Sequence, residues 1–321
     1  MKRTTTLEDV ARKAHVSKMT VSRVINHPEL VAPELQLVVE DAMHKLNYHP
    51  NHAARALATN QTNVVKFVIL EDVDGTDPYF TNVLFGVATG LKKENYTLQL
   101  LLDGKQINQG AADGVIITGA RTGEYPMLNQ IKMPFVLFGE NGGGYDFVDT
   151  NNLQGETMAA EYALKRGYSN IVFIGLDVKE AFEFSREAGY VNTMQQNKKI
   201  PRVFRLPNSS HDGRQFIEEH LDEFPKNTCF VCASDRIAMG VLQGLEAREA
   251  SVPADFGVIG FDGVLLNRVA SPTITTVKQA LWEIGEKLAY LILRKIRQDG
   301  APQGEMFIEP TLDVAESTKK D

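Results

Sequence analysis

The feature that most restricts the fold is an alternation of short apolar runs with helix-length segments, which continues from Val64 to Gln298. The runs have the length of buried strands, and the segments between them have apolar residues at helical spacing. Alternating strands and helices predict parallel sheets in an α/β arrangement. Because so many units would overfill one sheet, we expect two doubly wound lobes that face a cleft and bind ligands at the carboxyl ends of their strands.

One connection in this region is unusually short. The expected strands are residues 64–70, 97–102, 115–118, 135–138, 171–175, 203–206, 229–233 and 257–261. The expected helices are residues 80–93, 153–166, 182–195, 213–221, 236–248 and 282–298. Only residues 103–112 join the second strand to the third, whereas a parallel crossover needs a dozen or more residues and usually a helix. We therefore expect the first lobe to lack a helix, with one sheet face or edge bare, covered by a partner, or the strand order altered.

Composition places the chain among ordinary globular proteins. Its 321 residues suggest two or three domains, and the shares of hydrophobic (43%) and charged (23%) residues disfavour disordered or low-complexity classes. No apolar run approaches the ~20 residues that span a bilayer, and the N-terminus lacks the apolar core of a signal peptide. Two cysteines cannot form a disulfide framework. These features predict a cytoplasmic protein without a membrane segment.

The charge is unevenly distributed. The whole chain has a formal net charge of -7, but residues 1–60 hold eight Lys/Arg against six Asp/Glu, so that this part carries +2 and the rest -9. A mildly basic head on an acidic body is typical of a protein in which a small part touches nucleic acid.

The head has the pattern of three short helices. Thr6 is a plausible N-cap for a helix that ends at Ala14, and Ser17 can cap a second helix that ends at Asn26. A tight turn joins these two, and a third helix covers residues 33–46. This is the helix-turn-helix plan, in which the second helix lies in a DNA major groove.

Several stretches resemble the LacI/GalR family of bacterial transcription repressors. In the head these are TLEDVA at 6–11, VSKMTVSRVIN at 16–26, LNYHPN at 46–51 and AARAL at 53–57. Farther along they are DPYF at 77–80, ADGVII at 112–117, SREAGY at 185–190, SDRIAMG at 234–240, VIGFD at 258–262 and PTITTVKQ at 272–279. The resemblance covers nearly the whole chain and implies a helix-turn-helix domain at 1–50, a hinge at 51–63 and a two-lobed effector-binding and dimerisation domain of the periplasmic sugar-binding type at 64–321.

The resemblance implies which head residues contact double-stranded operator DNA. Lys18, Met19 and Arg23 would read bases, with Arg23 bidentate to a guanine and Met19 against a thymine methyl. The residues that would mainly hold phosphates are Thr6, Ser17, Thr20, Ser22 and Asn26. Ser17 and Thr20 have the alternative role of capping the helix. The chain departs from the family at Ala32 and Gln36, where Ser or Thr and Arg are common, and loss of an N-cap costs ~1 kcal/mol.

Residues 51–58 are too few for an isolated helix, which is marginal below ~12–15 residues. In the resembled family two such hinge segments fold on the operator and insert a leucine in the minor groove, and Leu57 matches that position. The alternative is an ordinary Ala-rich linker helix.

The resemblance also implies the effector contacts. Arg186, Ser234, Asp235 and Asp262 would bind the effector from one lobe, and Tyr79 and Phe80 from the other. Arginine and carboxylates pair with vicinal hydroxyls, and aromatic faces cover a sugar ring. The alternatives are helix N-capping for Asp235 and core packing for the two aromatics. Position 234 is Ser where the family often has Asn, and the loop 208–210 lacks an aromatic, so a stacking platform is absent there.

No motif indicates catalysis, a metal site or a cofactor. Cys229 and Cys232 form a CxxC pattern, but on a strand such residues point to opposite faces, so core packing is the favoured role. No GxSxG, HExxH or GxGxxG motif is present.

The predicted function is a homodimeric repressor that binds palindromic operator DNA, with an affinity controlled by a small effector, a sugar, between its lobes. Whether the effector releases or strengthens operator binding stays open. The alternatives are control by a protein partner or a non-sugar metabolite, and a sugar-binding protein or enzyme with the same core.

Overall fold

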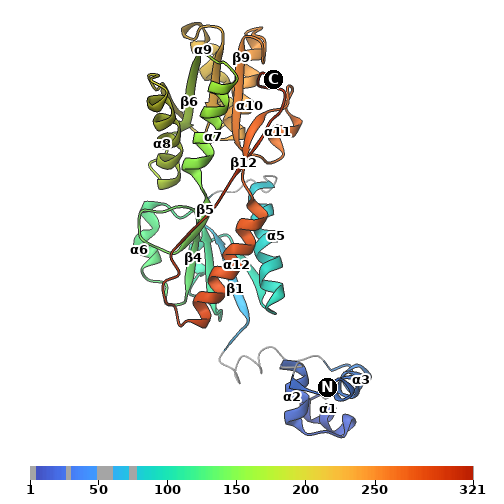
Figure 1. The fold of residues 1–321 in the computed structure, drawn as a ribbon. Coiled ribbons are helices and arrows are strands. Elements are labelled where there is room, and N and C mark those ends of the chain that lie inside the picture. Colours follow the sequence, from blue (N-terminus) through green and yellow to red (C-terminus); the bar gives the residue numbers. More distant parts are fainter. Residues whose placement is uncertain (1–4, 27–29, 49–60, 72–77, 321) are drawn as a thin grey trace. The chain divides into compact units, whose positions relative to one another are not determined.

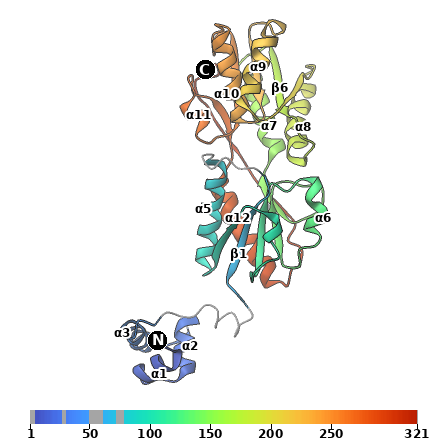
Figure 2. The same ribbon diagram turned by 180° about the vertical axis from the view of Figure 1, so that it is seen from behind.

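The computed structural model describes residues 5–26, 30–48, 61–71 and 78–320 (Figures 1 and 2). The chain forms two compact units, which divide after Thr62. Unit 1 holds the predicted head, and unit 2 holds the predicted α/β region. The predicted hinge helix at 51–58 lies outside the described residues, and so does Leu57 within it.

Unit 1 consists of three helices, α1 (Leu7–Ala14), α2 (Lys18–Asn26) and α3 (Pro33–Lys45). They pack around a core in which Val10, Val21 and Val39 are fully buried. His15 has a left-handed backbone with φ of +54° and makes the tight turn between α1 and α2. The third helix begins without a side-chain cap because Ala32 offers no acceptor. The predicted helix-turn-helix plan is confirmed.

Unit 2 consists of two lobes, each built on a six-stranded sheet. The sheet of lobe 1 contains β1 (Val64–Ile69), β2 (Thr97–Leu101), β3 (Gly114–Thr118), β4 (Phe135–Phe138), β5 (Phe147–Thr150) and β11 (Glu305–Ile308). Its order is β11-β5-β4-β3-β1-β2, and all neighbours are parallel. The chain thus leaves β1 on one side for β2 and then returns past it to β3, as predicted for a doubly wound lobe.

Two long helices, α5 (Pro78–Lys93) and α12 (Leu281–Arg297), cover one face of this sheet. They are far apart in the sequence, yet α12 packs along α5 (Figures 1 and 2). They meet at Gly86 and Gly285, where a side chain on either residue would collide with the backbone of the other helix. The short helix α6 (Tyr125–Leu128) contributes Leu128 to the core on the opposite face.

The short connection after β2 leaves the strand order unaltered, but β2 is an exposed edge, with Leu100 on β2 45% and Leu102 behind it 72% exposed, which agrees with the predicted bare edge. Its only helical turn is the 3-10 segment Gly104–Gln106, and Ile107 behind this turn is buried in the core of lobe 1. The Nζ of Lys66, on β1, donates to the carbonyl oxygens of Ile107 and Gln109 at 2.8 and 2.6 Å. The buried lysine therefore holds the shortened crossover against the sheet in place of a helix.

The sheet of lobe 2 contains β6 (Asn170–Leu176), β7 (Val203–Leu206), β8 (Thr228–Cys232), β9 (Phe256–Asp262), β10 (Thr275–Lys278) and β12 (Thr311–Asp313). Its order is β12-β10-β9-β8-β6-β7, and only the β10–β12 pair is antiparallel. The main helices are α7 (Asn152–Lys165), α8 (Ala181–Gln196), α9 (Ser210–His220) and α10 (Asp235–Ala247), and the short helix α11 (Leu266–Val269) follows β9. The pairs α7–α8 and α9–α10 lie on opposite faces, because the crossovers through α8 and α9 run in opposite directions.

The chain crosses between the lobes three times, after β5, after β10 and after β11. These three strands and β12 were not predicted from the sequence, whereas the long helices and the central strands were. Among the described residues, no helix has both the length and the apolar character to cross a membrane.

Candidate functional site

The first candidate site is the exposed face of α2 in unit 1. Lys18, Met19 and Arg23, the predicted base readers, are all exposed, and 62% of the Met19 surface is accessible. Val21 and Val24 on the opposite side of the helix are buried in the core of unit 1. The helix therefore presents a cationic face with one apolar side chain, as a recognition helix requires.

The predicted phosphate contacts are partly engaged in capping. Thr6 Oγ1 accepts from the Asp9 backbone N–H at 3.3 Å, and Ser17 Oγ accepts from that of Thr20 at 3.0 Å. Thr6 and Ser17 are exposed, whereas Thr20 and Ser22 are half-buried. Capping was the alternative role for Ser17, and the exposure of its hydroxyl side leaves the phosphate contact as a prediction. Asn26 ends α2, and its side chain lies outside the described part of the chain.

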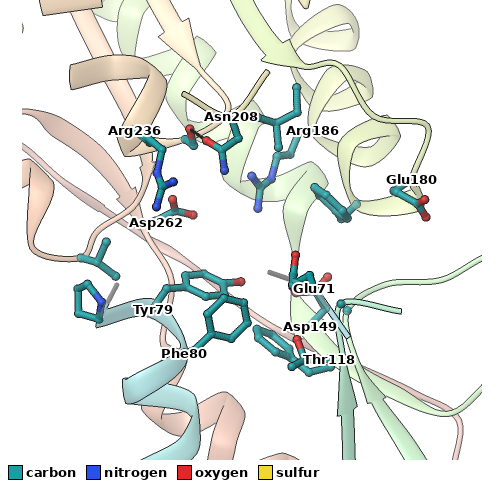
Figure 3. A pocket seen from close by; sticks show the side chains of 18 of the residues that line it. Glu71, Tyr79, Phe80, Thr118, Asp149, Glu180, Arg186, Asn208, Arg236 and Asp262 are labelled. Atoms are coloured by element: carbon teal, nitrogen blue, oxygen red, sulfur yellow. Dashed lines mark hydrogen bonds between the residues drawn. The ribbon is translucent and has the colours of Figure 1, made fainter. Parts of the chain in front are cut away.

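The second candidate site is a cleft of about 660 Å³ between the two lobes of unit 2 (Figure 3). Its walls are the segments that follow β1, β3 and β4 in lobe 1 and β6, β7, β8 and β9 in lobe 2, together with the start of α5. These are the carboxyl ends of parallel strands, where such folds bind ligands. The volume is in the range of about 300–1,000 Å³ that suits small organic ligands.

Five of the predicted effector residues line this cleft, namely Tyr79, Phe80, Arg186, Ser234 and Asp262. Asp235 does not line it, which corrects the prediction. Its fully buried carboxylate accepts from Thr276 Oγ1 at 2.6 Å and from the Gly263 backbone N–H at 3.0 Å. Nor does it cap α10, because the N-cap is Ser234, whose Oγ accepts from the Ile237 N–H at 3.1 Å. Asp235 instead supports the turn that follows Asp262.

Arg186 enters the cleft from α8 and is fixed on several sides. Its Nε donates to Asn152 Oδ1 at 2.9 Å, and its Nη1 donates to the Ala233 carbonyl oxygen at 2.6 Å. Its Cζ lies 3.8 Å from the centroid of the Phe261 ring and 5.4 Å from that of Phe182. A guanidinium held in this way presents its remaining N–H groups to a ligand in a fixed position.

Two buried carboxyl groups lie close to Arg186. Burial raises the pKa of Glu183 to about 7 and that of Glu156 well above its ordinary value, although the positive charge of Arg186 opposes both shifts. Glu183 Oε1 accepts from the Leu176 backbone N–H at 2.9 Å. Both oxygens of Glu156 and Oε2 of Glu183 have no hydrogen-bond partner among the described residues. Burial therefore favours the protonated form of both acids, and Glu183 is about half protonated at pH 7, which reduces the negative charge beneath the cleft.

Aromatic rings form the lobe 1 side of the cleft. The Tyr79 ring packs edge-on against Phe80 with centroids 5.2 Å apart and stacks with Phe138 at 5.9 Å. Burial, together with the carboxylates of Asp149 and Asp262, raises the pKa of Tyr79, so its hydroxyl stays a donor. Tyr79 and Phe80 thus pack in a core and also face the cleft, which combines the predicted role with its alternative.

The lining carries more carboxyl than guanidinium groups. The carboxyl groups are those of Glu71, Glu140, Asp149, Glu180 and Asp262. The guanidinium groups are those of Arg121, Arg186 and Arg236. Only Arg186 and Asp262 in this set were predicted. The signal that could have found Glu71, Arg121 and Glu140 is their position just after β1, β3 and β4, where parallel strands meet the cleft.

Side chains of the two lobes touch at one side of the cleft. Arg121 Nη2, in lobe 1, donates to Glu71 at 2.9 Å, and its Cζ lies 5.4 Å from the Phe182 ring of lobe 2. Ser185 Oγ of lobe 2 donates to Glu140 Oε1 of lobe 1 at 2.8 Å. Phe182 thus supplies an aromatic surface on lobe 2, although residues 208–210 supply only polar groups, as predicted.

Asp262 has an unusual backbone. Its φ of +125° lies in a region that favours glycine, and the next residue, Gly263, also has a positive φ. Such a conformation costs of order 1–3 kcal/mol and persists only where neighbouring groups hold it. Its backbone oxygen accepts from the Gln279 N–H at 3.1 Å, and Oδ1 accepts from Gln279 Nε2 at 2.8 Å. Gln279 therefore fixes both parts of this cleft residue.

The two cysteines lie in the core of lobe 2. Cys229 and Cys232 on β8 are fully buried and free, and burial raises the pKa of both thiols. This location agrees with the packing role that their strand spacing favoured.

Comparison with known proteins identifies the family. Residues 6–51 match "Bacterial regulatory proteins, lacI family", and residues 160–318 match "Periplasmic binding protein-like domain". The uncharacterized HTH-type transcriptional regulator YvdE of Bacillus subtilis (strain 168) is 46% identical over 314 residues, which are 98% of this chain and 99% of YvdE. The chain belongs to the lacI family of bacterial regulatory proteins.

Solved structures of similar proteins share the architecture of this regulator. The regulator in a CelR–cellobiose complex is 26% identical, with a TM-score of 0.75 over 98% of this chain and 99% of the other. The lac repressor dimer bound to operator and the anti-inducer ONPF is 21% identical, with a TM-score of 0.78 over 98% and 99%. The predicted fold is thereby confirmed, and the protein is a DNA-binding transcriptional regulator with an effector-binding core.

Proposed function

We propose that the regulator is a repressor that binds a palindromic operator as a homodimer and responds to a neutral sugar. The observation that carries the proposal is the exposed face of α2, which presents Lys18, Met19 and Arg23 outside a core of valines. Residues 1–50 would bind the operator, and residues 64–321 would bind the effector and dimerise. Residues 51–63 would be the hinge that links these two domains. Operator binding would place its action in the cytoplasm.

The chemistry of the cleft supports a neutral, hydroxyl-rich effector. The surplus of carboxyl groups in the lining disfavours an anionic ligand. Arginines and carboxylates offer donors and acceptors to hydroxyl groups, and Tyr79, Phe80 and Phe182 offer faces for the apolar side of a sugar ring. The similar CelR structure is a complex with cellobiose, which agrees with this class of ligand.

Control by a non-sugar metabolite or by a protein partner is the second candidate, and a sugar-binding protein or enzyme with the same core is the third. The match to YvdE over the full chain, head included, favours a regulator over the third. Titration of the purified protein with sugars, monitored by thermal denaturation, separates the first two. A ligand present at 100 times its Kd adds about 2.7 kcal/mol of stability.

Exposed apolar side chains support a dimer through one side of unit 2. Phe85 on α5 and Trp282 on α12 are 55% and 47% exposed, and their rings stack with centroids 6.4 Å apart. Leu265 and Val269 at α11 are also exposed, and both views place α11 and α5 on the same side of the unit (Figures 1 and 2). Clustered aromatic and aliphatic residues are typical of the centre of an interface. A second copy of this chain is the expected occupant, and the similar lac repressor structure is of a dimer.

Replacing Phe85 with aspartate is therefore expected to shift the protein from dimer to monomer, because a charge at the centre of an apolar interface loses its hydration. Sedimentation equilibrium of the full chain measures the change. Phe184→Asp is the matched control, since Phe184 is 57% exposed but lies on α8, on the opposite side of the unit (Figures 1 and 2). Equal association of both variants would show that the dimer uses another surface.

The operator contact is tested with Arg23→Ala on a site selected from random DNA by the purified protein. A bidentate contact to guanine is worth about 1–3 kcal/mol, so we expect affinity to fall roughly 5- to 150-fold at fixed salt. Specificity should relax at one base pair of each half-site, whereas loss of a phosphate contact weakens all sites uniformly. Lys45→Ala on α3 is the control. If selection enriches no palindrome, either without sugar or with ribose, maltose or cellobiose present, the proposed function is wrong.

A further inference from the structure

Two of the three lobe crossings are joined by a buried hydrogen bond. Thr150 ends β5, at the first crossing, and Gln279 follows β10, at the second. Thr150 Oγ1 donates to Gln279 Oε1 at 2.6 Å, and both side chains are almost completely buried. The third crossing is joined to the first by a backbone hydrogen bond, in which the Asn151 N–H donates to the Ile308 carbonyl oxygen at 2.9 Å, and by a more exposed contact, in which Asn151 Nδ2 donates to Glu309 Oε1 at 2.8 Å. The Thr150–Gln279 pair therefore lies where the lobes pivot.

Gln279 also holds a residue of the effector cleft. With Oε1 occupied by Thr150, its Nε2 donates to Oδ1 of Asp262, and its backbone N–H donates to the Asp262 carbonyl oxygen. These two hydrogen bonds matter because the φ of Asp262 is strained. Strained backbone conformations cluster at ligand-binding sites and persist only where neighbouring groups hold them. The side-chain amide of Gln279 thus contacts the first crossing through Oε1 and the carboxylate of a cleft residue, Asp262, through Nε2.

A second route joins the same crossing to the opposite part of the cleft. Asn152 Nδ2 donates to the Thr150 carbonyl oxygen at 3.1 Å, and Asn152 Oδ1 accepts from Arg186 Nε. The segment at Thr150 and Asn152 is therefore bonded both to Asp262, through Gln279, and to Arg186. Ligand groups that pull on either side chain would act on the same crossing.

We infer that Gln279 is a positioning residue that transmits effector occupancy at Asp262 to the lobe pivot through Thr150. This inference rests on the proposed function of the cleft. When a ligand fixes Asp262, Gln279 selects one arrangement of the first and second crossings, and the lobes adopt the angle that this arrangement allows. Coupling of this kind needs a contact that differs between two states, and the inference assigns that part to the Thr150–Gln279 bond.

The test uses three variants of the full chain. Thr150→Val removes the hydroxyl at nearly constant volume, and Thr150→Ser keeps it. Glu309→Ala removes the side-chain contact at the third crossing, keeps the backbone bond there, and is the control. Operator affinity is measured for each variant with and without ribose, maltose or cellobiose at fixed salt. Calorimetric titration gives the Kd of each sugar separately.

A sugar that changes the operator Kd of the original protein by a typical factor of about 5–150 is expected to change that of Thr150→Val less than about twofold. The Kd with which the sugar binds Thr150→Val should change by a much smaller factor than the sugar's effect on the operator Kd does. Thr150→Ser and Glu309→Ala should keep the original factor. The inference would be overturned if the sugar changed the operator Kd of Thr150→Val by the full original factor. It would also be overturned if Thr150→Ser lost as much of this factor as Thr150→Val.

A second readout does not depend on a sugar. Nitroxide labels at Lys132→Cys in lobe 1 and Gln195→Cys in lobe 2, both exposed positions, report the distance between the lobes. Labelled chains are diluted with unlabelled ones so that only distances within one chain contribute. We expect a displaced or broadened distribution in Thr150→Val and an unchanged one in Thr150→Ser. Superimposable distributions in Thr150→Val and the parent would overturn the inference. If none of the three sugars acts on the parent, the sugar proposal fails while this readout still decides the role of Thr150.

Discussion

Arg186→Lys is expected to weaken effector binding about 100-fold while operator binding without effector is retained. Lysine keeps a positive charge near Glu156 and Glu183, so the buried acids do not lose their neighbouring cation. It cannot reproduce the planar fork that bonds Asn152 and Ala233 and lies on Phe261 at 3.8 Å. A hydrogen bond from the guanidinium to the ligand contributes about 1.5–3 kcal/mol, and loss of one worth about 2.8 kcal/mol corresponds to 100-fold.

Calorimetric titration with whichever of ribose, maltose and cellobiose binds the parent protein measures this loss. Arg202→Lys is the matched control, because Arg202 also lies over aromatic rings, 4.7 Å from the Phe224 centroid, but not in the cleft. The control should bind the sugar as the parent does. An unchanged Kd in Arg186→Lys would show that the ligand does not contact the guanidinium.

The long elements could be predicted because their signals are local. The caps at Thr6 and Ser17, the Pro33 start of α3 and the apolar spacing of α5 and α12 depend only on neighbouring residues. The strands β5, β10, β11 and β12 have three or four residues and, unlike the equally short but wholly apolar β4, they contain polar or charged residues; three of them end at the lobe crossings. Their assignment depends on pairing with strands from distant parts of the chain.

The cleft was predicted in part. Arg186 and Asp262 follow from a resemblance, but sequence alone does not show which of two adjacent residues, Ser234 or Asp235, faces the ligand. The structure decides it by the register of α10, which turns Asp235 under the sheet toward Thr276 and leaves Ser234 at the cleft. The proximity of Glu183 to Glu156 arises from the packing of α7 on α8, which no local pattern reports.

The shortened crossover could be predicted by counting residues, but the contacts that compensate for the missing helix could not. Counting residues predicted a missing helix, and only one 3-10 turn is present. Lys66 interrupts an apolar strand, and sequence alone gave no reason for it. The structure supplies one, because its ammonium satisfies carbonyl groups of the short connection while Ile107 fills the core. A charge within a buried strand can therefore mark a place where tertiary structure replaces a lost element.

Glu183→Gln is expected to stabilise unit 2 by about 3 kcal/mol at pH 8 and to leave its stability unchanged at pH 4. The pKa of about 7 in the folded state lies above the ordinary value of 4.5, so between these pH values the folded state keeps a proton that the unfolded state has lost. The contribution of Glu183 to the free energy of unfolding of the parent protein is therefore most favourable below about pH 4.5, and this contribution is lost as the pH rises through 7. A shift of one pKa unit corresponds to 1.36 kcal/mol, which gives about 3 kcal/mol for the whole change.

Glutamine keeps the acceptor for the Leu176 N–H and has no charge to bury, so the variant should lack this pH dependence. Denaturant unfolding of the full chain at pH values from 4 to 8 measures the free energy of unfolding for both proteins. Glu161→Gln, at an exposed position on α7, is the control and should follow the parent curve. If Glu183→Gln and the parent lose stability equally between pH 5 and 8, Glu183 is ionised in the folded protein, and the proton near Arg186 is not held there.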